Sequence, residues 1–188
     1  MKKDIELVKD IILLRPYQSG DAASVFKAVL ESINELGPWM PWCHAGYTLK
    51  ESKTWIKSCG ESWDKGSAYE FAILDSGTGL YLGGCGLNHI DTAYRTANLG
   101  YWVRTGQTRR GVATTAALLL ARFGLTELKL NRIEIIAAIE NFRSQRVAEK
   151  AGAKREGILR NRIPLGDRAH NAVVFSFIPQ DVMLDTER

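Results

Sequence analysis

The segment from Asn141 to Gly152, NFRSQRVAEKAG, carries the most specific pattern in the chain. Asn141 can cap a helix by accepting a hydrogen bond from a free backbone N–H, and Gly152 can end that helix in a left-handed conformation. Helical spacing places Ser144 on the apolar face of this helix. The segment therefore predicts a short capped helix. A hydroxyl on its inward face needs a partner, which suggests that Ser144 contacts a bound cofactor, and a purely structural helix is the alternative.

A second segment, Gln107 to Thr114 (QTRRGVAT), precedes the longest predicted helix. Backbone N–H groups at a helix N-terminus bind anions, helped by the positive end of the helix dipole. Gly111 lets the backbone approach a ligand closely because it has no Cβ. Arg109 and Arg110 add two cations suited to phosphate oxygens. The segment therefore predicts a phosphate site, and an ordinary helix start with solvated arginines is the alternative.

Around these segments, hydrophobic spacing and turn residues predict an alternation of strands and helices. Asp21 is expected to cap the first helix, and Thr48 with Glu51 forms a capping box at the start of the second. The predicted helices cover residues 21–36, 49–63, 111–127 and 143–151. The predicted strands cover residues 11–14, 69–74, 80–88, 97–104, 133–138, 154–160 and 172–178. Hairpin turns among the strands favour one α/β domain whose sheet is not purely parallel.

Composition excludes several classes of protein. The 188 residues are 45% apolar and 24% charged with a net charge of +4, typical of one globular domain rather than a disordered or fibrous chain. The three cysteines form no CxxC pair, which favours reduced thiols, and no run reaches the roughly 18 to 20 apolar residues of a membrane span. The three histidines lie far apart, so no metal site is expected.

Taken together, these segments resemble the GNAT acyltransferase superfamily, and in particular its RimJ/RimL branch of ribosomal-protein N-terminal acetyltransferases. Further stretches fit that branch: LRP at 14–16, WMPW at 39–42, LGYWV at 99–103, LNRI at 130–133, EGILR at 156–160 and HNAVVFS at 170–176. The resemblance implies a single-domain α/β GNAT fold, with a mixed and centrally splayed β-sheet flanked by helices. Residues 8–183 would form this domain, and residues 1–7 an N-terminal extension.

The resemblance also implies acetyl-CoA as co-substrate, bound in the splay of the sheet without a metal. The backbone of Tyr101, Trp102, Val103 and Arg104 would pair with the pantetheine amides. The pyrophosphate would lie on Thr108, Arg109, Arg110, Gly111, Val112, Ala113 and Thr114. Asn141 and Ser144 would face the thioester end, with Arg146 and Lys150 near the nucleotide.

The family's reaction is attack of an amine on the acetyl thioester. Ser144 would donate a hydrogen bond to the leaving sulfur. The branch often has a glutamate where this chain has Asn98, so a usual candidate for the general base is missing. Glu70 and His89 remain as candidate bases. Trp39, Met40 and Trp42 would wall the acceptor groove, or they would fill the gap between the first two helices.

The sequence leaves several kinds of acceptor amine open. An α-amino group of pKa about 7.7–8.0 is roughly one-tenth neutral at pH 7, whereas a lysine is only about 0.04% neutral. A site without an obvious base therefore favours a protein N-terminus, of the ribosomal-protein type. The alternatives are a small amine (a polyamine, amino acid or antibiotic) and a non-catalytic CoA-binding module. We expect a cytoplasmic protein without membrane or direct nucleic-acid binding, and a homodimer stays open.

Overall fold

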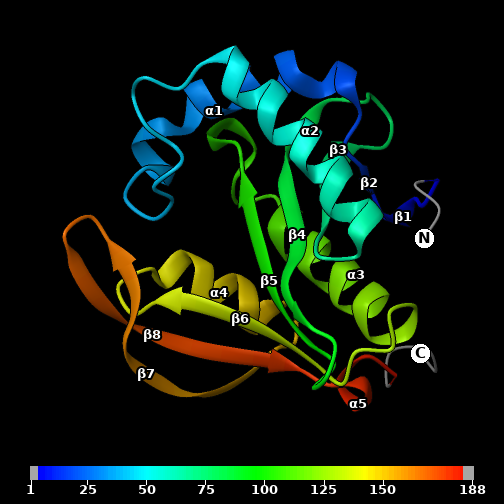
Figure 1. Ribbon diagram of the computed structural model, residues 1–188, viewed down its shortest axis with the longest axis vertical. Helices are drawn as coiled ribbons and strands as arrows, with labels where there is room; N and C mark the ends of the chain where they lie inside the picture. The colour runs from blue at the N-terminus through cyan, green and yellow to red at the C-terminus, as the bar shows by residue number, and fades with distance from the viewer. Residues whose placement is uncertain (1–3, 184–188) are drawn as a thin grey trace.

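The computed structural model describes residues 4–183. Its strands are β1 (Leu7–Lys9), β2 (Ile12–Pro16), β3 (Tyr69–Asp75), β4 (Tyr81–Asp91), β5 (Thr96–Val103), β6 (Arg132–Ala138), β7 (Lys154–Leu165) and β8 (Arg168–Phe177). Its α-helices are α1 (Ala22–Leu36), α2 (Leu49–Lys65), α3 (Val112–Thr126), α4 (Phe142–Lys150) and α5 (Pro179–Met183), with 3-10 turns at Ser19–Asp21 and Thr105–Gln107. Figure 1 shows α1 and α2 together at one end of the molecule, and α3 beside the central strands.

The eight strands form one mixed sheet in the order β1-β2-β3-β4-β5-β6-β8-β7. All neighbours are antiparallel except β5 and β6, which are parallel. The predicted α/β domain with a mixed sheet is therefore confirmed. Leu7, which the sequence assigns to the N-terminal extension, pairs with Leu14 in β2.

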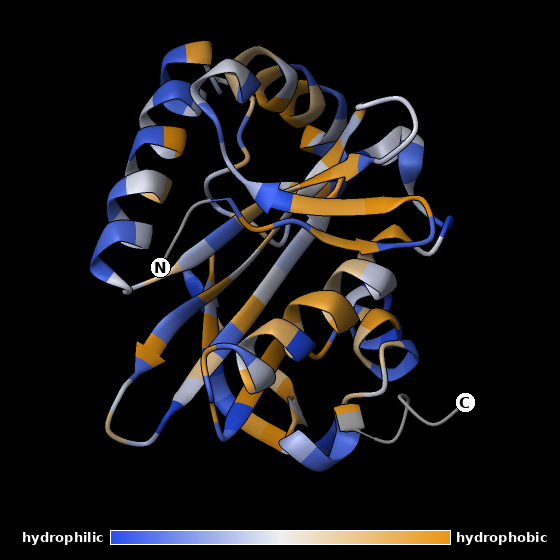
Figure 2. Ribbon diagram, turned by 90° about the vertical axis from the view of Figure 1, so that its right-hand side faces the viewer, coloured by the Kyte–Doolittle hydropathy of each residue, from blue (hydrophilic) through white to orange (hydrophobic). Residues whose placement is uncertain are grey.

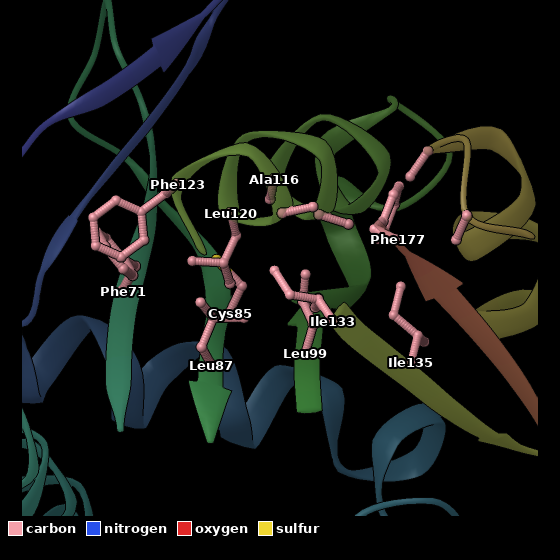
Figure 3. Packing of buried hydrophobic residues seen from close by; sticks show 14 of the residues in the cluster. Phe71, Cys85, Leu87, Leu99, Ala116, Leu120, Phe123, Ile133, Ile135 and Phe177 are labelled. Carbon is pink, nitrogen blue, oxygen red and sulfur yellow. The ribbon is translucent and has the colours of Figure 1, made fainter. Parts of the chain in front are cut away.

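The core lies mainly between α3 and one face of the sheet. Leu120 and Phe123 of α3 point toward Phe71 and Leu87 of the strands, as Figure 3 shows. A second cluster joins α1 and α2 to the opposite face through Val25, Val29, Ile56 and Ala72. Figure 2 shows long hydrophobic stretches in some of the strands, and helices that carry both hydrophobic and hydrophilic residues. The two clusters hold the sheet between helical layers.

Two local predictions are wrong. The Asp21 side chain does not cap α1; it pairs with Arg15 at 2.7 Å and accepts the Gln18 N–H at 2.8 Å, because it lies within reach of a partly buried guanidinium. The last hairpin is also longer than predicted, since β7 extends to Leu165 and β8 begins at Arg168. The added residues are mostly polar and exposed, and therefore lack the alternation that signals a strand.

Candidate active site

The sheet opens between its two parallel strands. β5 and β6 pair only where Thr96–Asn98 lie against Arg132–Glu134. Beyond that point the strands diverge, as Figure 1 shows, while β5 stays paired to β4 as far as Val103. One edge of β5, from Leu99 to Val103, therefore has no strand partner, and its N–H and C=O groups can pair with an extended ligand.

A narrow cavity of ≈ 130 Å³, here called the slot, occupies this opening. Its walls come from β5, β6, the start of α4, the α1–α2 connection and the β7–β8 hairpin. The lining residues are Trp39, Met40, Asn98, Leu99, Gly100, Tyr101, Ile135, Ile136, Ala137, Ala138, Asn141, Ser144, Ile163 and Leu165. The slot thus brings together five of the predicted site residues, Trp39, Met40, Tyr101, Asn141 and Ser144.

Ser144 is fixed at the slot by two neighbours. Its N–H donates to the Asn141 side chain at 3.0 Å, which confirms the predicted cap of α4. The Tyr101 hydroxyl donates to the Ser144 carbonyl at 2.8 Å and lies 3.1 Å from Ser144 Oγ. Burial raises the pKa of Tyr101 to about 12, although its hydrogen bond to Ser144 acts in the opposite direction. Tyr101 therefore stays protonated and holds the serine in place.

The turn before α3 has the geometry of an anion site. Gly111 has φ +78°, and open space surrounds the position where a Cβ would lie. The first-turn N–H groups of α3, which begins at Val112, have no partner within the helix. Arg109 and Arg110 are exposed beside this turn, and Arg110 donates to the Gln107 side chain. Thr108 uses its hydroxyl locally, donating to the Thr105 carbonyl at 3.0 Å.

The remaining residues that were predicted to contact the coenzyme differ in how accessible their side chains are. Arg146 and Lys150 are exposed on α4. The Val103 side chain is buried in the core below α3. The Arg104 guanidinium pairs with Glu31 of α1 and donates to the Tyr81 carbonyl at 3.2 Å. The Arg104 backbone is occupied as well, because its N–H donates to the Leu82 carbonyl at 2.9 Å and its carbonyl accepts from the Gln107 N–H at 3.0 Å. Of these two residues, only Val103 therefore keeps backbone groups for a ligand.

A larger cavity of ≈ 480 Å³, here called the aromatic cavity, lies on the α1–α2 side of β5. It is lined by Tyr17, Val25, Met40, Pro41, Trp42, His44, Tyr47, Glu51, Trp55, Glu70, Gly84, Cys85, Gly86, Asn88, Gly100, Tyr101 and Trp102. Met40, Gly100 and Tyr101 line both the aromatic cavity and the slot. The two cavities therefore meet at these residues.

Glu70 is the acidic group on the floor of the aromatic cavity. It pairs across the sheet with Gly86, and a Cβ at Gly86 would collide with the Glu70 carboxylate. The side chain thus lies over β4, one strand away from Gly100. Burial raises the pKa of Glu70 to about 7, with a hydrogen bond to the Asn88 side chain acting in the opposite direction. A carboxyl group with this pKa exchanges protons near neutral pH.

Asn88 links Glu70 to Asn98. The Asn98 side-chain amide donates to Asn88 Oδ1 at 2.9 Å, which leaves the Asn88 amide group for Glu70. Asn98 occupies the position where the resembling branch often carries a glutamate. The cavity nevertheless contains a carboxylate, which comes from β3 rather than β5.

The structure places His89 away from both cavities and divides Trp39, Met40 and Trp42 between them. His89 is exposed, with φ +49°, beside an irregularity in the β4–β5 pairing, and it lines neither cavity. Trp39 lines the slot, Trp42 lines the aromatic cavity, and Met40 lines both. Trp42 also contacts Trp102 edge-on, with ring centroids 5.6 Å apart.

Several residues of the site were missed from the sequence: Gly86, Asn88, Tyr47 and Trp55. The run Gly83-Gly84-Cys85-Gly86 inside a predicted strand was the available signal, because glycine in a strand interior often marks a close approach by another group. The contributions of Tyr47 and Trp55 depend on how α2 packs against the sheet, which local spacing does not encode.

Within residues 4–183, no cluster of three or more His, Cys, Asp and Glu side chains is arranged to hold a metal ion. No helix of that part of the chain is long and apolar enough to span a membrane.

Residues 12–154, more than half of the chain, match the model of the acetyltransferase (GNAT) domain. The chain is 26% identical over 178 residues to the "Putative ribosomal N-acetyltransferase YdaF" of Bacillus subtilis, covering 93% of this chain and 94% of that protein. The structure of a "putative ribosomal-protein-serine acetyltransferase" from Vibrio cholerae has a TM-score of 0.84 and 28% identity, covering 95% of this chain and 100% of that one. A RimL ribosomal alpha-N-protein acetyltransferase in complex with coenzyme A has a TM-score of 0.86 at 18% identity, covering 95% and 99% of the two chains. That last likeness concerns the fold alone.

Proposed function

Because the chain belongs to the GNAT family of acetyltransferases, we propose that it acetylates a primary amine held in the aromatic cavity, using acetyl-CoA. The α-amino group of a protein N-terminus is the acceptor that the site fits best. The observation that carries the proposal is the junction at Gly100 and Tyr101, where the cavity with a carboxyl group meets the slot.

The slot and the turn before α3 together fit the coenzyme. An extended pantetheine arm can take up the free backbone groups of β5 between Leu99 and Val103. The pyrophosphate can take up the first-turn N–H groups of α3, close to the exposed Arg109 and Arg110. Acetyl-CoA supplies an acyl group activated as a thioester, and related folds include a RimL acetyltransferase in complex with coenzyme A.

Glu70 acts as the base. The amine nitrogen forms the new bond to the acyl carbon, the C–S bond breaks, and the electron pair leaves on sulfur. Glu70 takes the proton released from nitrogen, while the Ser144 hydroxyl stabilises the departing sulfur by a hydrogen bond. Tyr101 positions Ser144 through the carbonyl contact described above.

The pKa of Glu70 favours an α-amine over a lysine. Transfer of a proton from an α-amino group of pKa about 7.7–8.0 to a carboxylate with a pKa of about 7 costs about 1 kcal/mol. The same transfer from a lysine of pKa about 10.4 costs about 5 kcal/mol. A base with this pKa is therefore strong enough to deprotonate the α-amino group of a protein N-terminus. Separately, the names of two similar proteins support ribosomal proteins as acceptors. Such an acceptor would place the enzyme in the cytoplasm.

The proposal is tested by measuring thiol release from acetyl-CoA with four kinds of acceptor: N-terminal peptides, lysine peptides, polyamines and aminoglycosides. Mass spectrometry of the product then identifies the acetylated nitrogen. We expect the fastest release with an N-terminal peptide, modified on its α-nitrogen. Preferential acetylation of a polyamine or an aminoglycoside would assign a small-molecule acceptor. Tight coenzyme binding without thiol release from any amine would indicate a non-catalytic module.

Replacement of Ser144 by alanine removes the hydroxyl nearest Tyr101 in the slot. We expect turnover to fall by roughly one to three orders of magnitude, because the leaving sulfur loses a hydrogen-bond donor. The affinity for acetyl-CoA, measured by calorimetry, should stay close to that of the wild type. Ser24→Ala, which removes an exposed hydroxyl on α1, is the matched control. Unchanged turnover in S144A would remove Ser144 from the mechanism.

A further inference from the structure

The aromatic cavity is wider than a small acceptor needs. Its side walls are rings from separate parts of the chain: Trp42 and Tyr47 from the α1–α2 connection, Trp55 from α2 and Trp102 from β5. Trp42 stands edge-on to both Tyr47 and Trp102, with ring centroids 6.4 and 5.6 Å away. The cavity volume of ≈ 480 Å³ lies within the range of sites that enclose whole small-molecule ligands. An alanine or serine side chain would leave much of this apolar wall without contacts.

The acidic and basic side chains on the wall are two carboxyl groups and one imidazole. Glu51 and Glu70 line the cavity together with His44, and none of its lining residues in the described chain is a lysine or an arginine. Glu51 is held at the rim, where its carboxylate accepts the Thr48 N–H at 2.8 Å and lies 3.0 Å from His44 Nε2. A ligand carboxylate entering this space would face two acidic groups and no lysine or arginine, and the one imidazole, that of His44, is already paired with Glu51. A cationic amine among tryptophan and tyrosine rings is attracted by the ring faces.

On the basis of the acetyl transfer proposed above, we propose that the preferred acceptor carries its primary amine next to a bulky aromatic or branched apolar group, with no carboxylate beside it. The amine points to Glu70 and Gly100, and the apolar group fills the space between Trp42, Trp55 and Trp102. Two sources share this chemistry: a protein N-terminus that begins with a large apolar residue, and a free arylalkylamine.

The test compares three peptides that differ only in their first residue, which is phenylalanine, serine or glutamate, together with phenylalanine amide and alanine amide. Thiol release from acetyl-CoA gives kcat/KM for each. We expect the peptide that begins with phenylalanine to exceed the one that begins with serine by about 10- to 100-fold, and the one that begins with glutamate to be the poorest. Phenylalanine amide should exceed alanine amide by a similar factor. A peptide faster than phenylalanine amide indicates a protein source, and the reverse order indicates a free amine.

Binding is also measured by intrinsic fluorescence, because three tryptophans line the cavity. If no amine is acetylated, the proposed transfer fails, but the fluorescence titration still reports whether phenylalanine amide binds at least tenfold tighter than alanine amide. If acetylation proceeds and the serine peptide equals or exceeds the phenylalanine peptide, the acceptor preference is overturned while the transfer function stands. Equal binding of the two amides would overturn the preference as well.

Trp42→Ala and Trp55→Ala test the wall itself. Both side chains are about four-tenths exposed (43% and 42%), so their truncation leaves the core intact. Each variant should lower the ratio of kcat/KM for the phenylalanine peptide to that for the serine peptide by about tenfold. Tyr94→Ala removes an aromatic ring that is 76% exposed in the β4–β5 turn and should leave the ratio unchanged. A ratio that stays constant in both tryptophan variants contradicts the proposal.

Discussion

Replacement of Glu70 by glutamine is expected to lower kcat by about two to four orders of magnitude, the usual contribution of a general base. Glutamine keeps the size of the side chain and its contact with Asn88, but it cannot take a proton from the amine. Coenzyme binding, measured by calorimetry, should not change, because Glu70 lines the aromatic cavity and not the slot. Glu61→Gln, which neutralises an exposed carboxylate on α2, is the matched control.

The pH dependence gives an independent reading of the same group. Wild-type kcat/KM should rise with pH along a limb centred near 7, because Glu70 must be ionised to act and its pKa is about 7. Since the acceptor amine also loses its proton as pH rises, the limb must be compared with that of E70Q, in which only the amine contribution remains. A limb near 7 that is identical in E70Q would assign the titration to another group.

The raised pKa of Glu70 should make the free energy of unfolding depend on pH. Burial moves the pKa of Glu70 from its ordinary value of 4.5 to about 7, so the folded state holds the proton more tightly than the unfolded state. The resulting stabilisation is complete below pH 4.5 and is lost as pH rises through 7, a decrease of about 3 kcal/mol in the free energy of unfolding. In E70Q this decrease should be absent in denaturant titrations across the same pH range. Equal pH dependence in both proteins would show that Glu70 titrates normally.

Replacement of Gly111 by valine is expected to weaken coenzyme binding by about 100-fold or more. Gly111 has φ +78°, a conformation that a β-branched residue adopts only under strain, and its Cβ would occupy the space beside the first-turn N–H groups of α3. Calorimetry with CoA measures the loss of affinity directly. A circular dichroism spectrum identical to that of the wild type would show that α3 is still formed.

Gly166→Val is the matched control for strain. Gly166 also has a left-handed backbone, φ +62°, and open space around its missing Cβ, but it lies in the turn between β7 and β8. The two variants should lose similar stability, and only G111V should lose affinity for CoA. If G111V binds CoA with native affinity, the pyrophosphate lies elsewhere.

Most of the fold could be predicted because its elements carry local signals. The Asn141 cap, the Thr48–Glu51 capping box and the left-handed Gly152 each depend on residues close in sequence, and the structure contains all three. The β7–β8 extension could not be predicted, since its exposed polar residues form a strand only through pairing with each other.

The segments proposed to hold the coenzyme were easier to single out from the sequence than the lining of the aromatic cavity, for the same reason. The turn before α3 and the start of α4 are contiguous segments, whereas the aromatic cavity gathers residues from Tyr17 to Trp102. Glu70 was a candidate base because of its residue type and its position on a predicted central strand. Its placement over Gly86 and its bond to Asn88 arise from strand register, which links positions 16 and 18 residues apart.

The short pairing between β5 and β6 has a wider consequence. Every residue that lines the aromatic cavity lies at or before Trp102 in the sequence, whereas α3, β6 and α4 follow it. Among the described residues, the aromatic cavity and the slot share Met40, Gly100 and Tyr101 in their linings. If the proposed roles hold, substitutions in the aromatic cavity away from these three shared residues would change which acceptor is bound, while the proposed coenzyme contacts on α3 and α4 stay in place.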